Sequence, residues 1–238
     1  MDYGLQLYSV KDFMAKDVKG TIAQVAAMGY KVVEPAGFFG VSAEDFKAYC
    51  DEAGVVATST HTGIGELTDE NFPAIVQYLK TIGCKRYIIP GAPTNTKEEL
   101  DNTIAIINKY QPMLAAEGLE LMYHNHSREF LPNEDGIFPH LEMQKRTTIN
   151  FQIDVYWTYR AGLNPLYILE SLKDRITIIH LKDGTMEHDA PLGEGTTPIA
   201  EIVDWALAND VDIVVENEPT AERQMIEAEI CSEYLKKL

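Results

Sequence analysis

Short apolar runs alternate with amphipathic stretches along the chain, and this alternation predicts strands and helices in turn. In the amphipathic stretches apolar residues recur at spacings of three and four, as at Ile22, Val25 and Ala26. Ser42 and Thr96, each three residues before an acidic residue, predict helix starts. The apolar runs show no strict polar alternation, which is typical of parallel strands buried on both faces. The pattern therefore predicts an α/β protein with a parallel sheet.

A glycine separates helix from strand at four places in the first half of the chain. Each of these glycines follows a helical stretch, and an apolar run begins within four residues of it: Gly29, Gly54, Gly83 and Gly118. Glycine readily adopts the left-handed conformation that closes a helix. The spacings of 25 to 35 residues match one βα unit. The second half continues with helices predicted over 166–172, 199–208 and about 221–237.

Eight strands are predicted in all, over residues 4–9, 32–34, 55–61, 87–89, 119–123, 149–154, 176–181 and 212–216. Eight βα units in 238 residues fit a (β/α)8 TIM barrel, which typically has about 250 residues. We predict one such domain over residues 1–238. A doubly wound open sheet is the alternative, but it calls for a Gly-rich turn after the first strand, and Ser9-Val10-Lys11-Asp12 is not one.

Composition narrows the class of partner. The chain has 45% hydrophobic residues and 24% charged residues, which excludes disorder. It carries 37 acidic and 20 basic residues, a formal charge of −17, without a basic cluster for nucleic acid or an anionic membrane. Three widely spaced cysteines, the lack of an evident signal peptide and the lack of a long apolar run favour the cytoplasm. We expect a small-molecule partner.

Polar residues gather where the predicted strands end. In a TIM barrel the chemistry lies at the carboxyl ends of the strands. Four of the six histidines fall there, together with several acids: Gln6, Tyr8, Glu34, His61, His124, His126, Asp154, His180, Lys182, Asp183 and Glu216. Buried carboxylates and imidazoles are costly unless they are paired or bound to a cation. Asp154, His180, Glu216 and one histidine of strand five could hold one divalent ion, and mixed N/O ligands suit Mn, Co, Fe or Zn.

The chain resembles the xylose isomerase-like barrel superfamily, in its branch of sugar phosphate isomerases and epimerases. The resemblance covers essentially the whole chain. It is carried by seven motifs: Gly4-Leu5-Gln6-Leu7-Tyr8-Ser9-Val10, Val33-Glu34-Pro35-Ala36-Gly37, Tyr123-His124-Asn125-His126 with Glu129-Phe130, Gln152-Ile153-Asp154-Val155, His180-Leu181-Lys182-Asp183, Gly193-Glu194-Gly195 and Val215-Glu216-Asn217.

The resemblance implies a metal centre. The family usually holds its ion with Glu, Asp, His and Glu from strands five to eight, and Asp154, His180 and Glu216 match the last three positions. The first position falls on His124, which departs from the family glutamate. Trp157 is a second departure, because several relatives carry there a histidine that contacts substrate. In ketose epimerases of this superfamily the two ligand glutamates also act as the acid/base pair, and only Glu216 remains here.

Such a site would act on a sugar or keto-sugar derivative through an enediolate-type intermediate. A base removes the proton next to a carbonyl that the metal polarises. We predict Glu216 as one base, His126 or Glu129 as the second, and Lys182 as the cation that neutralises a developing oxyanion.

The remaining predictions concern substrate contacts and the competing functions. Gln6, Tyr8, Glu34, His61 and Trp157 are predicted to contact substrate, although strand-end hydrogen bonds within the barrel would give the same pattern. A metal-dependent isomerase or epimerase is the leading function, with a keto-sugar or keto-inositol dehydratase as the alternative. Phosphodiester hydrolysis and metal-dependent sugar binding without turnover are also considered. We expect a monomer or homodimer.

Overall fold

The computed structural model describes residues 1–238, and its parallel strands form a barrel. The strand order is β3-β2-β1-β11-β8-β7-β6-β5-β4, and every neighbouring pair is parallel. The third strand of the barrel is interrupted at Thr58 and so consists of β3 and β4, and the barrel closes beyond this point. There the amide of His61 donates to the Pro35 carbonyl at 2.8 Å, and the amide of Gly37 donates to the His61 carbonyl at 2.7 Å. The predicted α/β TIM barrel is confirmed, and the open-sheet alternative is wrong.

The barrel strands are short and are followed by the helices of the outer ring. They are β1 (Gly4–Gln6), β2 (Val32–Glu34), β3 (Val56–Ala57), β4 (Ser59–His61), β5 (Arg86–Ile89), β6 (Glu120–His124), β7 (Asn150–Asp154), β8 (Ile178–Leu181) and β11 (Asp212–Val215). The helices are α1 (Lys11–Met14), α2 (Val18–Met28), α3 (Ala43–Ala53), α4 (Phe72–Ile82), α5 (Lys97–Ala116), α6 (Pro139–Arg146), α7 (Val155–Arg160), α8 (Pro165–Ser171), α9 (Ile199–Ala208) and α10 (Gln224–Leu235).

Shorter elements occupy the loops. Five 3-10 turns are η1 (Leu7–Val10), η2 (Ile64–Glu66), η3 (Ser127–Phe130), η4 (Lys173–Arg175) and η5 (Ala221–Arg223), and a small hairpin joins β9 (Asp183–Gly184) to β10 (Asp189–Ala190). No helix combines the length and the apolar character that crossing a membrane would require.

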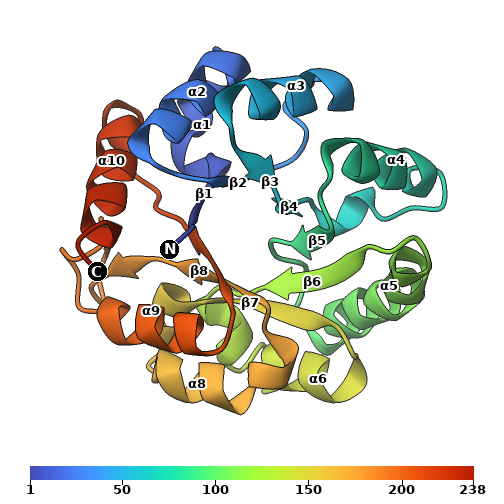
Figure 1. Ribbon diagram of the computed structural model, residues 1–238. Coiled ribbons are helices and arrows are strands. Elements are labelled where there is room, and N and C mark those ends of the chain that lie inside the picture. The colour runs from blue at the N-terminus through green and yellow to red at the C-terminus, as the bar shows by residue number, and fades with distance from the viewer.

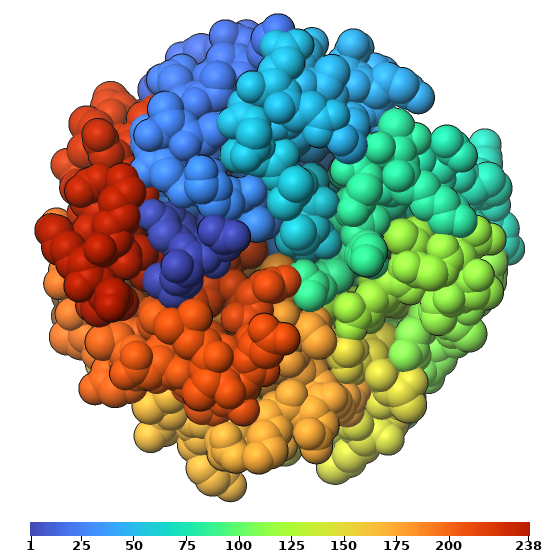
Figure 2. All heavy atoms as spheres, in the orientation of Figure 1, coloured from blue at the N-terminus to red at the C-terminus, as the bar shows by residue number.

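The ring of helices closes between the two ends of the chain. Figure 1 shows the strands at the centre with the helices around them, and α10, in red, lies beside the blue N-terminal helices. The same meeting of red and blue segments is seen in the space-filling view (Figure 2). The Tyr30 hydroxyl donates to the Ala228 carbonyl at 2.8 Å, and the Ser232 hydroxyl donates to the Met28 carbonyl at 2.7 Å. The last helix therefore completes the outer layer.

The local signals at the helix ends agree with the structure, but the first strand is shorter than expected. Ser42 and Thr96 accept hydrogen bonds from the amides three residues later, as capping residues do. Gly83 closes α4 with a φ of 78°. The predicted strand over 4–9 is wrong beyond Gln6, because the Gln6 side chain accepts from the Tyr8 amide at 3.0 Å and turns the chain into η1. This turn carries Tyr8 to the rim of the barrel.

The inside of the barrel changes from apolar to polar along the strands. One cluster inside it consists of four buried residues from four strands: Ile88, Met122, Ile178 and Val214. Side chains of a strand return to the same face every second residue. Two residues further along β6 and β8 stand His124 and His180, and Glu216 follows Val214 at the end of β11. The apolar layer therefore supports a polar layer at the carboxyl ends.

His140 makes protein stability depend on pH. This fully buried residue of α6 lies between the rings of Phe130 and Phe151, at centroid distances of 4.3 and 4.6 Å. Burial, helped by the charge of Arg175, lowers the pKa of His140 from 6.5 to about 3. As the pH falls, the unfolded chain therefore takes up the proton before the folded protein does. The stability that the neutral, buried His140 contributes is fully present above pH 6.5 and is lost as the pH falls toward 3. We expect a loss of about 2 kcal/mol at about pH 5 from this residue.

Urea unfolding of the wild type and of His140→Leu at about pH 7.5 and about pH 5 checks this expectation. The drop in unfolding free energy between the two pH values should be smaller in the variant, which has no proton to take up. An equal drop in both proteins would contradict the assignment to His140.

Candidate metal centre and active site

Four predicted metal ligands come together at the carboxyl ends of β6, β7, β8 and β11. Ligand atoms of His124, Asp154, His180 and Glu216 all lie within 4.8 Å of one another. All four residues are buried, with exposures from 0% to 7%. The set spans strands five to eight of the barrel, which is the order expected from the sequence. His61 lies equally close to His124 and His180, so three imidazoles also lie together.

The two carboxylates of this cluster do not ionise equally easily without a bound cation. Burial and the charge of Glu216 raise the pKa of Asp154 to about 7, although Lys182 acts in the opposite direction. Burial would also raise the pKa of Glu216, but His180 and Lys182 outweigh it and hold that pKa well below its usual range. Burial lowers the pKa of His180, but Glu34 and Glu216 outweigh burial and raise it to about 10. A divalent ion would stabilise the two carboxylates together.

Two ligand atoms of the cluster have no hydrogen-bond partner. Nδ1 of His124 and Oδ2 of Asp154 are buried and unpaired, although buried polar atoms are nearly always paired in folded proteins. Burial, with the charge of His180, holds the pKa of His124 well below its usual range, so its imidazole is neutral as a metal ligand must be. The donor set of two imidazoles and two carboxylates thus fits a divalent transition metal.

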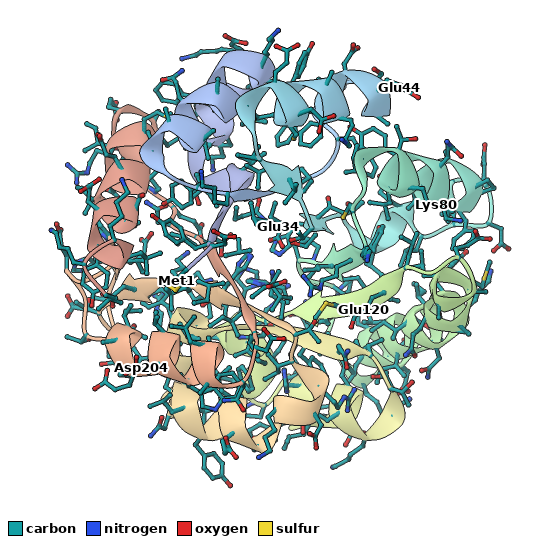
Figure 3. All side chains as sticks on the ribbon, in the orientation of Figure 1. Met1, Glu34, Glu44, Lys80, Glu120 and Asp204 are labelled. Carbon is teal, nitrogen blue, oxygen red and sulfur yellow. The ribbon has the colours of Figure 1, made fainter.

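Glu34 lies beneath this cluster, within the barrel, and its carboxylate is surrounded by donors. Oε1 accepts from Nε2 of Gln6 at 2.7 Å and contacts Nε2 of His180 at 2.7 Å. Oε2 accepts from Nε2 of Gln152 at 2.9 Å and from the Ser59 hydroxyl. Figure 3 shows Glu34 inside the ring, whereas Glu44, Lys80 and Asp204 lie on its outside. Glu34 is wholly buried, so its side chain lies inside the barrel and out of contact with solvent.

A cavity of about 360 Å³ opens above the cluster. That size suits a small-molecule ligand. Its lining includes five of the predicted residues, of which His124 and Glu216 are predicted metal ligands: Tyr8, His61, His124, His126 and Glu216. Glu218, which was not predicted, also lines it. Gln6, Glu34, Trp157 and Lys182 are not among the lining residues. The substrate contacts predicted for Gln6, Glu34 and Trp157 therefore stay predictions without a place in this cavity wall.

Lys182 is a buried cation beside the acids. Its side chain has 0% exposure, and its Nζ lies 2.5 Å from Oε1 of Glu218. The Nζ also lies 4.8 Å from the centroid of the Trp157 ring, within the range of a cation–π contact. Burial lowers the pKa of Lys182, but Glu216 and Asp154 outweigh burial and raise it above its usual value. Lys182 is therefore a fixed positive charge close to the carboxylates, and Trp157 covers it.

His126 and Glu129 occupy different places, which separates the two candidates for a second base. The His126 ring lines the cavity and lies 5.0 Å from the His124 ring, and burial lowers the pKa of His126. Glu129 is wholly buried, and its carboxylate accepts from the His126 amide at 2.8 Å and from the Tyr123 hydroxyl at 3.2 Å. Glu129 thus holds the loop, and only His126 faces the cavity.

Asp183, the last residue of the predicted His-Leu-Lys-Asp motif, holds the loop above the site. Its carboxylate accepts from the amides of Gly193, Gly195 and Thr197 at 2.9, 3.0 and 3.1 Å. A Cβ on Gly195 would meet Oδ1 of Asp183 at 2.2 Å, which explains the glycine there. The motif Gly193-Glu194-Gly195 therefore serves the loop.

Three residues of the site were not singled out from the sequence. Gln152 and Ser59 stand two positions before Asp154 and His61, and the strand period places them on the same face. That period is the signal that could have identified them. Glu218 stands two positions after Glu216 but beyond the end of β11, where no strand period applies.

The fold and the site together define a (β/α)8 barrel with a candidate metal centre at the carboxyl ends of its strands. A family model described as a xylose isomerase-like TIM barrel matches residues 22–230. The chain belongs to this family, as its motifs indicate.

Solved structures with the same fold include sugar phosphate isomerases/epimerases. One from Parabacteroides distasonis ATCC 8503 shares 28% identity, with a TM-score of 0.86 over 100% of this chain and 98% of the other. A 3-keto-D-glucoside 4-epimerase from E. coli covers 100% of both chains at a TM-score of 0.76. At 18% identity the second similarity shows the fold alone.

Two curated relatives are inosose dehydratases. The inosose dehydratase of Geobacillus kaustophilus (strain HTA426) is 22% identical over 192 residues, which cover 71% of this chain and 62% of the relative. An inosose dehydratase of Clostridium beijerinckii is matched over 45% of its length. The matched part of this chain thus spans less than two thirds of either relative.

Proposed function

We propose that the protein is a divalent-metal-dependent isomerase or epimerase of a sugar or keto-sugar derivative, working through an enediolate-type intermediate. The observation that carries the proposal is the buried cluster of His124, Asp154, His180 and Glu216, two of whose ligand atoms are unpaired beneath an open cavity. The family and the 28% identical sugar phosphate isomerase/epimerase support a sugar-like substrate.

Different residues of the site would have different roles in the reaction. The cluster would hold the ion, which polarises a substrate carbonyl when bound. Glu216 has an ionised carboxylate at the cavity wall and takes the proton from the carbon next to that carbonyl. Lys182 is buried behind the cavity wall, and its fixed positive charge would stabilise, without contact, the negative charge that develops on the substrate oxygen. His126 lies on the cavity wall, and its protonated ring would return a proton to the substrate and be left as the neutral imidazole that burial favours.

A dehydratase acting on a keto-sugar or keto-inositol is the second candidate. Two observations favour it: both curated relatives are inosose dehydratases, and His124 stands where the family glutamate of the epimerase pair is expected. The same proton abstraction would then be followed by loss of a β-hydroxyl group rather than by return of the proton.

Product analysis in deuterated water separates the two reactions. The metal-loaded protein is incubated with D-fructose, D-tagatose and scyllo-inosose, and products are followed by proton NMR and mass spectrometry. An isomerase or epimerase is expected to give products of unchanged formula with one solvent deuterium on the carbon that loses its proton. A dehydratase is expected to give products lighter by one water.

The matched control is the chelator-treated protein reloaded with the same metal. Activity should disappear with the chelator and return on reloading. A purified protein that binds no divalent ion would contradict the proposed function. Binding of metal and sugar without exchange or turnover across a wide keto-sugar panel would instead indicate a sugar-binding protein.

A further inference from the structure

The environment of Glu34 assigns this residue a part in the metal centre. Its carboxylate is buried and contacts side chains from four strands, β1, β4, β7 and β8. These side chains are Gln6, Ser59, His61, Gln152 and His180. With 0% exposure Glu34 has no contact with the cavity, and every oxygen lone pair it offers faces a donor within the protein. The substrate contact predicted from the sequence would not explain these internal contacts of Glu34.

The direction of the hydrogen bonds fixes which nitrogen of His180 carries a proton. Oε2 of Glu34 faces two groups that can only donate to it, the Gln152 amide and the Ser59 hydroxyl. The carbonyl oxygen of Gln152 lies on the other side, 2.7 Å from Nε2 of His61. An acceptor carboxylate 2.7 Å from Nε2 of His180 requires a proton on that nitrogen.

The other nitrogen of His180 faces the acids. Nδ1 lies 3.2 Å from Oε2 of Glu216 and 4.0 Å from Oδ2 of Asp154. The ring is also held in plane by stacking on His61, with centroids 4.8 Å apart and an interplanar angle of 22°. A histidine that binds metal through one nitrogen commonly donates its other N–H to a carboxylate, which fixes both tautomer and orientation.

We propose that Glu34 is the positioning residue of the metal centre, which holds the proton of His180 on Nε2 so that Nδ1 is presented to the divalent ion. The proposal rests on the metal site of the proposed function. Glu34 acts through His180 and does not touch the substrate. Glutamine in its place would turn an NH2 group toward donors whichever way the amide is set, so at least one contact would be lost.

Metal affinity tests this role. Zn²⁺ affinity is measured by chelator competition for the wild type, Glu34→Gln, Glu34→Asp and Glu120→Gln. Glu120 is the matched control, since it stands at the start of β6, away from the strand ends that carry the cluster, and bonds to Asn150 (Figure 3). We expect Zn²⁺ to bind about 10- to 100-fold more weakly to Glu34→Gln, with recovery in Glu34→Asp and no more than about a twofold change in Glu120→Gln.

Kinetics separate positioning from substrate contact. If Glu34 positions His180, the activity of Glu34→Gln should rise as metal is added and the KM for substrate should stay near the wild-type value. A raised KM with unchanged Zn²⁺ affinity would overturn the proposal and restore the substrate-binding interpretation. Circular dichroism confirms that the variants compared are folded.

A measurement on the wild type keeps the proposal testable if Glu34→Gln does not fold. Nitrogen-15 shifts of the His180 ring, identified by their loss in His180→Gln, should show a protonated Nε2 with and without Zn²⁺, and Zn²⁺ should shift Nδ1. An unprotonated Nε2 would overturn the proposal. Failure of the wild type to bind any divalent ion is a different result, because it contradicts the proposed function itself.

Discussion

Glu216→Gln is expected to lower kcat by about a thousandfold, the effect typical of removing a general base. Glu216 lines the cavity, and its carboxylate is kept ionised by His180 and Lys182 despite burial. The amide cannot accept a proton, and it also removes one charge from the metal centre. Steady-state kinetics at saturating metal measure the loss, and Glu44→Gln, on the outside of α3 (Figure 3), serves as the control.

Asp154→Asn distinguishes the two roles of Glu216. Asp154 is placed to hold the ion but lies outside the cavity lining. Its asparagine variant should therefore bind metal weakly and regain much of its turnover when the metal concentration is raised. Glu216→Gln should stay slow at any metal concentration. Equal recovery of both variants would show that Glu216 serves only as a ligand, and unchanged turnover in both would contradict the whole site.

Lys182→Met has the second largest expected effect, a fall in kcat of about 100- to 1,000-fold. Methionine retains much of the length of the side chain under Trp157 and removes the positive charge that lies 2.5 Å from Glu218. A developing oxyanion would lose the positive charge that stabilises it. Steady-state rates at saturating metal measure the loss.

The pattern of the loss checks the role of Lys182. A cation that acts on the transition state lowers kcat and kcat/KM together, whereas a cation that only binds substrate raises KM at constant kcat. The unfolding midpoint in urea controls for damage to the fold. Wild-type turnover by a folded Lys182→Met protein would remove Lys182 from the mechanism.

Much of the barrel could be predicted because its signals are local. Gly83 ends a helix with a positive φ, and Ser42 and Thr96 begin helices by accepting backbone hydrogen bonds, all within a few residues of sequence. The strand period then places Asp154 and His180 at the carboxyl ends of their strands. The first strand was predicted too long because the bond from the Tyr8 amide to the Gln6 side chain competes with strand geometry.

The sequence by itself determined the succession of strands and helices, the fold family and the group of acids and histidines at the strand ends, because each depends on periodicity or on a short motif. Only the tertiary structure decided what those side chains meet. Glu34 lies 118 residues from Gln152 and 146 from His180 along the chain, and closure of the barrel brings them within 2.9 Å. Pairings at such separations depend on the register of strands that are distant in sequence. The difference between a residue that contacts substrate and one that positions a metal ligand is therefore a property of the closed barrel.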